Sequence, residues 1–161
     1  TLTVNGVSKA YAMTGWRIGY MGGPGPIIAA AEKIQSQTTS CASSISQKAA
    51  CAALKLDLNG AVEEMVGKFD ERRHFLMRVF SGLKLNYIEP RGAFYLFFEV
   101  KPFLKSSDEF CEYFLRNHHL AMVPGAAFGA PSWVRISYAC AMADLQKAEQ
   151  RLSCGLAKLA G

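Results

Sequence analysis

Residues 6–19 read GVSKAYAMTGWRIG, and this run indicates more about the fold than any other part of the chain. It sets Lys9 among small and apolar residues, with Arg17 eight positions later and Gly19 two beyond that. A lysine whose amine is desolvated can lose its proton near neutral pH and attack a carbonyl carbon. A nearby arginine can hold an anionic group through charge-assisted hydrogen bonds. The pattern therefore suggests a ligand with an aldehyde and a phosphate, although residue type alone favours an ordinary surface lysine.

An aldehyde and a phosphate on one molecule describe pyridoxal 5′-phosphate. The run resembles, over fourteen consecutive positions, the lysine signature of the class I/II aminotransferases, which include aspartate aminotransferase. Its segment AMTGWR (residues 12–17) resembles the prokaryotic-type aspartate/prephenate subgroup. The resemblance implies that Lys9 is catalytic and binds pyridoxal phosphate as a Schiff base, and that Arg17 binds its phosphate. Ser8 is a further phosphate-binding candidate, although the serine of some family members stands three residues before the lysine, where this chain has Gly6.

A second arginine, Arg135, lies in the apolar run WVRISYA (residues 133–139). An arginine inside an apolar strand needs a partner, because an isolated buried charge is very costly. That partner is either a neighbouring carboxylate or the carboxylate of a substrate held bidentately, and sequence physics leaves both open. The run resembles the family strand whose arginine binds the α-carboxylate of the amino-acid substrate, which implies a substrate-binding role for Arg135.

Two further segments resemble landmarks of the same family. PGAAFG (residues 124–129) resembles its PGxxFG turn, and it lacks the lysine that a nucleotide-binding P-loop requires. GAFY (residues 92–95) resembles the start of a family strand, in which we interpret Phe94 and Tyr95 as core aromatics. The four landmarks follow the family order over nearly the whole chain.

Composition describes a globular chain: half of the 161 residues are hydrophobic and 19% are charged. The net charge of +5 comes from basic residues that mix with acids, as in KFDERR (residues 68–73), which is typical of solvated helix faces and not of a nucleic-acid-binding surface. Five cysteines without CxxC pairing, and three histidines away from other ligands, predict free thiols, a reducing compartment and no metal site. No apolar run is long enough to span a bilayer, and the sequence does not distinguish cytoplasm from plastid.

Hydrophobic periodicity predicts an α/β segment followed by a compact α+β unit. The helix expected over residues 60–82 has an apolar stripe on one side, and its length suggests a connector between two domains. In residues 93–100, the side chains that would face either side of a strand are mostly apolar, so we expect that strand to be covered on both faces. The expected strands are 1–4, 17–21, 85–88, 93–100, 120–123 and 133–138, and the expected helices are 26–37, 43–55, 60–82, 106–117 and 142–159.

The resemblance implies the C-terminal part of the pyridoxal-phosphate-dependent transferase fold type I. Residues 1–70 would then be the end of the large cofactor domain, including the start of the connecting helix, and residues 71–161 the small α+β domain. In the family, the aspartate that contacts the ring nitrogen precedes the lysine strand, and the active sites are shared across a homodimer. We therefore expect this chain to be a fragment with little transaminase activity alone.

The implied reaction is transamination between an amino acid and a 2-oxo acid, with Lys9 moving the substrate's Cα proton. Two alternatives stay open. One is another reaction on the same scaffold, such as a lyase or a synthase, and the other is a non-catalytic remnant that serves as a binding or dimerisation module. The sequence does not indicate which substrate side chain is recognised.

Overall fold

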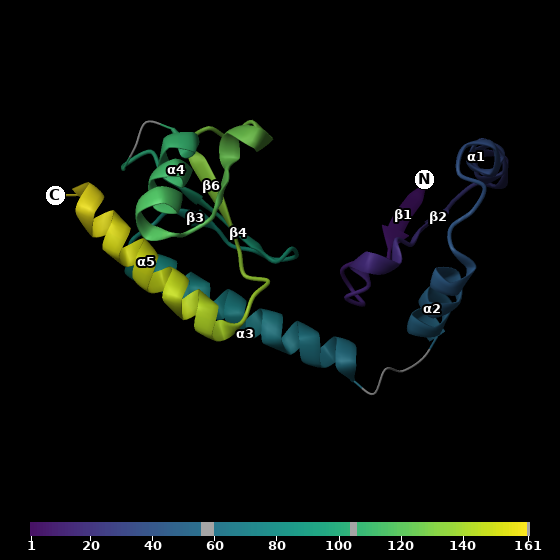
Figure 1. Ribbon diagram of the computed structural model, residues 1–161, viewed down its shortest axis with the longest axis horizontal. Helices are drawn as coiled ribbons and strands as arrows, with labels where there is room; N and C mark the ends of the chain where they lie inside the picture. The colour runs from purple at the N-terminus through teal and green to yellow at the C-terminus, as the bar shows by residue number, and fades with distance from the viewer. Residues whose placement is uncertain (56–59, 104–105, 161) are drawn as a thin grey trace. The chain divides into compact units, whose positions relative to one another are not determined.

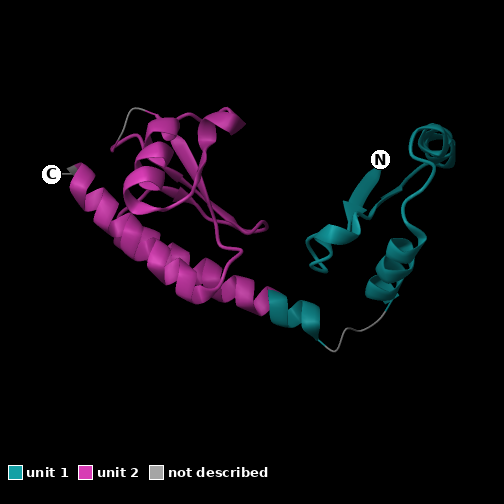
Figure 2. Ribbon diagram, in the orientation of Figure 1, with its two compact units in different colours: residues 1–65 teal, residues 66–161 magenta. Residues whose placement is uncertain are grey.

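The computed structural model describes residues 1–55, 60–103 and 106–160, which form two compact units. Unit 1 comprises residues 1–65 and unit 2 comprises residues 66–161 (Figure 2). The division falls inside the long helix α3 (Ala61–Gly82), which the sequence predicted over residues 60–82. None of the described helices is long and apolar enough to cross a membrane.

Unit 1 consists of a β-hairpin and two helices. Strands β1 (Thr3–Gly6) and β2 (Gly19–Gly22) pair antiparallel, and the loop between them contains the short 3-10 helix η1 (Thr14–Trp16). Helix α1 (Gly25–Thr38) follows with Pro26 in its first turn, where proline is favoured because its missing N–H is not needed. Helix α2 (Ser44–Lys55) is rich in alanine and buries three small residues.

Very little of unit 1 is buried. Its core cluster consists of Val7, Ile18 and Ala50, and helix α1 has no buried residue. Large apolar side chains stay open to solvent instead, with Val4 74%, Ile34 68% and Ile45 73% exposed. A two-stranded sheet with no apolar face covered is marginally stable at best in water.

Unit 2 is built on a four-stranded antiparallel sheet in the order β3-β4-β6-β5 (Figure 1). The strands are β3 (Tyr87–Ile88), β4 (Tyr95–Glu99), β5 (Val123–Pro124) and β6 (Trp133–Ser137). On β4, Leu96 and Phe98 are fully buried, whereas Tyr95, Phe97 and Glu99 are half-buried. The expectation that both faces are covered is therefore met on the inner face only; the outer face is partly open.

Three helices supply the rest of the unit 2 core. Helices α4 (Ser107–His118) and α5 (Met142–Ala160) pack against each other, and both belong to the same cluster as the inner face of the sheet. Ser106 caps α4 by accepting a hydrogen bond from the Glu109 backbone at 3.2 Å, at the start of the helix expected from residue 106. Helix α3 contributes Leu76 and Phe80, whereas Val66 on its predicted stripe is 61% exposed.

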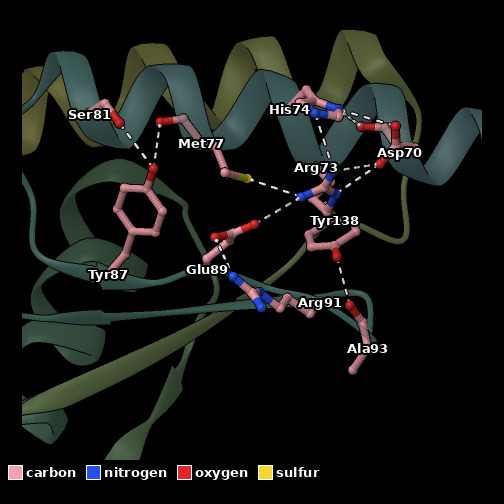
Figure 3. A network of polar contacts seen from close by, with 10 residues as sticks. All are labelled: Asp70, Arg73, His74, Met77, Ser81, Tyr87, Glu89, Arg91, Ala93 and Tyr138. Carbon is pink, nitrogen blue, oxygen red and sulfur yellow. Dashed lines mark hydrogen bonds and ion pairs between the residues drawn. The ribbon is translucent and has the colours of Figure 1, made fainter.

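Polar contacts tie α3 to the hairpin of β3 and β4 (Figure 3). Arg73 donates to Asp70 at 2.8 Å and lies 3.9 Å from a carboxylate oxygen of Glu89 in the turn after β3. The hydrogen bond from Arg73 lowers the pKa of the Asp70 carboxyl. At the other end of the turn, the Tyr138 hydroxyl donates to the carbonyl of Ala93 at 2.6 Å. The Arg73 contact brings the turn after β3 to the helix, and the Tyr138 bond ties the residues that lead into β4 to the end of β6.

Candidate functional site

The hairpin of unit 1 brings the two ends of the lysine loop together. Gly6 pairs with Gly19, and the next residue inward, Val7, donates its backbone N–H to the carbonyl of Ile18 at 3.4 Å. Val7 is fully buried and Ile18 is 8% exposed, so this pair anchors the loop. Ser8 and Arg17 are the residues directly beyond the anchored pair. Strand pairing therefore places Ser8, Lys9 and Arg17 on one loop at one end of the hairpin.

The loop is ordered by its own backbone. Tyr11 donates to the carbonyl of Val7 at 3.3 Å and Ala12 to that of Lys9 at 3.2 Å, which makes a tight turn around the lysine. Ser8 is half-buried within it, whereas Lys9 is exposed. The desolvation of the lysine amine that the sequence suggested is therefore not provided by the part of the chain that the structure describes. Lys9 does have a contact within the chain.

Arg17 has an unusual backbone. Its φ of 54° lies in the left-handed region, where a side chain other than glycine is strained by roughly 1 kcal/mol or more. Its Nη1 donates to the carbonyl of Thr14 at 3.1 Å, which holds the guanidinium beside η1. The side chain is exposed, and no carboxylate among the described residues forms an ion pair with it. The loop thus carries an amine, a hydroxyl and a guanidinium, the last without a carboxylate partner among the described residues.

Arg135 lies on the outer face of the unit 2 sheet and is half-buried. Its guanidinium carbon lies 4.1 Å from the ring centre of Tyr95 and 4.6 Å from that of Phe128. Within the described ranges, its side chain has neither a carboxylate partner nor a hydrogen-bond acceptor. Of the two partners that the sequence left open, a structural ion pair is therefore not found in this part of the chain.

The turn before β6 determines where Phe128 lies. The 3-10 helix η2 (Gly125–Phe128) follows β5, and a methyl group at Gly125 would overlap the carbonyl oxygens of Ala130 and Trp133. The fully buried Ser107 accepts a hydrogen bond from the Ala126 backbone at 3.2 Å, which fixes η2 to the start of α4. Glycine at position 125 is thus required by space, and the PGAAFG turn is a packed structural element.

Sequence reasoning missed two residues of this arrangement. It interpreted Tyr95 as a core aromatic and gave Phe128 no role, yet both rings contact Arg135. Strand alternation offered a signal for Tyr95, because a residue opposite Ser137 lies on the same face as Arg135. No comparable signal existed for Phe128, which lies outside any strand. No group of three or more residues able to hold a metal ion occurs in the described ranges.

A family model described as Aminotransferase class I and II matches residues 1–152. A bifunctional aspartate and glutamate/aspartate-prephenate aminotransferase from Petunia hybrida is 49% identical over 97% of this chain, and an aspartate aminotransferase from Rhizobium meliloti is 45% identical over 99%. The chain spans only 35% and 41% of the length of these two curated relatives.

Solved structures show the same likeness. An aromatic aminotransferase from Pyrococcus horikoshii superposes with a TM-score of 0.94 at 40% identity, covering 98% of this chain and 43% of that one. An aspartate aminotransferase from Thermotoga maritima superposes with a TM-score of 0.90 at 39% identity, covering 97% and 40%. These neighbours confirm the fold class predicted from the sequence, and their lengths agree with a chain that corresponds to part of a larger protein.

Proposed function

Because the chain belongs to the class I and II aminotransferases, we propose that it is the C-terminal part of an enzyme that transfers an amino group between an amino acid and a 2-oxo acid with pyridoxal phosphate. The observation that carries this proposal is the hairpin loop that holds Ser8, Lys9 and Arg17 together. Its donor set fits the cofactor: an amine that reacts with an aldehyde, and a guanidinium and a hydroxyl that bind a phosphate.

We assign the residues of the loop as follows. The Lys9 Nζ would hold the cofactor aldehyde, and its amine would take the proton from the substrate Cα and return it, as general base and then acid. Arg17 and Ser8 would hold the phosphate. When bound, pyridoxal phosphate supplies an electron-withdrawing ring that stabilises negative charge at Cα. Lys9 is exposed in the described residues, so exclusion of water from its amine would have to come from the rest of the enzyme and the bound ligands.

Arg135 is our candidate for binding the substrate. Its guanidinium carries in-plane donors without a protein acceptor among the described residues, and such a fork matches the two oxygens of a carboxylate. Holding the α-carboxylate fixes the orientation of the substrate, so that the Cα–H bond is presented for proton removal.

The names of the relatives support aspartate or prephenate-type partners, and we propose an amino-acid and 2-oxo-acid pair of that class as substrates. We further propose that residues 1–70 belong to the large cofactor domain, that residues 71–161 form the small domain, and that the full-length enzyme is a homodimer. Since more than half of each relative lies outside the match, we expect low transaminase activity from this chain alone.

Trapping of the cofactor tests the lysine assignment. Incubation of the purified chain with pyridoxal phosphate, followed by borohydride reduction and peptide mapping, should place the adduct on Lys9. Lys9→Ala should abolish that adduct, whereas Lys33→Ala, which removes an exposed lysine from α1, should leave it unchanged. Equal labelling of Lys9 and Lys33 would contradict the proposal.

The class of reaction is tested on the full-length enzyme. In transamination, consumption of more than one equivalent of amino acid per active site requires a 2-oxo acid acceptor. Repeated turnover of an amino acid without that acceptor would identify a lyase or a synthase on the same scaffold instead.

A further inference from the structure

Arg135 is surrounded by aromatic side chains from two different elements. Tyr95 comes from β4 and Phe128 from η2, and both rings lie within 4.6 Å of the guanidinium carbon. A cation over an aromatic ring is attracted by the negative charge of the ring face. A ring face offers no acceptor comparable to a carboxylate, so these contacts fix the guanidinium and leave its N–H donors available.

The ring of Phe128 is itself held in place. Phe97, directly opposite Arg135 in the sheet, stacks on Trp133 with ring centres 5.4 Å apart and contacts Phe128 edge to face at 6.5 Å. The turn that carries Phe128 is fixed by Gly125 and by the hydrogen bond to Ser107. Arg135 therefore lies in a surrounding whose geometry is set before any ligand arrives.

We propose that Tyr95 and Phe128 are positioning residues for the substrate carboxylate: they hold the Arg135 guanidinium in one place so that it receives a carboxylate without first becoming ordered. The entropy cost of fixing a long, flexible side chain is then met on folding and not on binding. This inference rests on the proposed function, because it takes Arg135 as the residue that binds the carboxylate.

The test is an NMR titration of the full 161-residue chain with propionate, which carries a carboxylate and no other polar group. Saturation transfer to the propionate methyl resonance measures binding in every variant, and the Nε–Hε resonance of Arg135 reports it directly wherever the arginine is present. Tyr95→Leu and Phe128→Leu should each raise the dissociation constant for propionate by about threefold to tenfold. Tyr95→Phe and Phe128→Tyr keep the rings and should bind propionate like the unsubstituted chain. Phe103→Leu, which removes a half-buried ring without a recorded contact to Arg135, is the matched control and should bind normally.

The outcomes separate this inference from the proposed function. If Arg135→Ala leaves propionate binding unchanged, Arg135 is not the carboxylate residue, and both that assignment and the positioning role are wrong, whereas the assignment of Lys9 is tested separately by cofactor trapping. If Arg135→Ala removes binding while the two leucine variants bind normally, only the positioning role is wrong.

A second measurement does not depend on variants: ring currents of Tyr95 and Phe128 should shift the Arg135 Hδ and Hε resonances upfield in the free chain. Unshifted resonances would overturn the inference.

Discussion

Arg17 combines a strained backbone with the charge assigned to the cofactor phosphate. We expect Arg17→Ala to reduce the labelling of Lys9 by pyridoxal phosphate at least about tenfold, because a charge-assisted contact to an anion is lost. Labelling by pyridoxal, which has the aldehyde but no phosphate, should stay the same. The comparison is made by quantitative peptide mapping after borohydride reduction. An equal loss with both aldehydes would show that Arg17 supports the loop and does not bind the phosphate.

The cysteines differ in their surroundings, and this predicts different reactivity. Burial, with a smaller contribution from the Asp108 charge, raises the pKa of Cys111 from 9.0 to about 11. Cys41, Cys51 and Cys154 are exposed. Since the thiolate is the reactive form, iodoacetamide at pH 8 should modify the three exposed thiols readily and spare Cys111 until the protein unfolds. Mass spectrometry of peptides at several times measures the order, and early modification of Cys111 would contradict its burial.

Two glycines in helices give opposite predictions for the same substitution. Gly155 in α5 faces α4, and a methyl group there would overlap the ring of Phe114 and crowd His118. Gly155→Ala should therefore destabilise the chain by about 1–3 kcal/mol through overpacking. Gly67 in α3 has open space around it, so Gly67→Ala should stabilise the helix by about 0.5–1 kcal/mol. Thermal unfolding followed by circular dichroism checks both signs.

Among the helices and strands, those that depend on local sequence patterns were predicted best. The expected helix 106–117 is found as α4, and the apolar periodicity of α3 and α5 predicted both helices closely. Strand lengths were less predictable: the expected strand 85–88 is reduced to Tyr87–Ile88, because only those residues pair with β4. A pairing partner is a tertiary property that no local pattern contains.

The candidate site likewise has a part that local sequence patterns predict and a part that depends on tertiary structure. The identity of Lys9, Ser8, Arg17 and Arg135 as candidates came from the sequence, because each stands in a recognisable run. The aromatic surroundings of Arg135 came only from the structure, because Tyr95 and Phe128 are brought together from separate elements by strand register and by the η2 turn. Whether the Lys9 amine is desolvated was left open by the sequence, since it depends on what packs over the loop.

Alkaline pH should weaken the fold of unit 2 as a whole. Burial raises the pKa values of Cys111, Tyr138 and Cys140 in the folded chain. As the pH rises, the unfolded chain therefore loses these protons before the folded chain does. For Cys111, the free energy of unfolding keeps its full value below pH 9 and falls as the pH rises through about 11. Urea unfolding at pH 8 and pH 10.5 should show a lower midpoint at the higher pH. Cys111→Ala should reduce that difference, and an unchanged difference would exclude Cys111 as a contributor.

The bare hairpin of unit 1 has a consequence for how the chain behaves in a cell. Strands β1 and β2 each keep one edge without a partner among the described residues, and apolar residues such as Val4 lie beside those edges. Open strand edges with apolar neighbours recruit other chains and promote aggregation. Produced as these 161 residues alone, part of the polypeptide should enter inclusion bodies, and the soluble part should self-associate as its concentration rises. Co-production with the remaining part of a family member should return it to the supernatant.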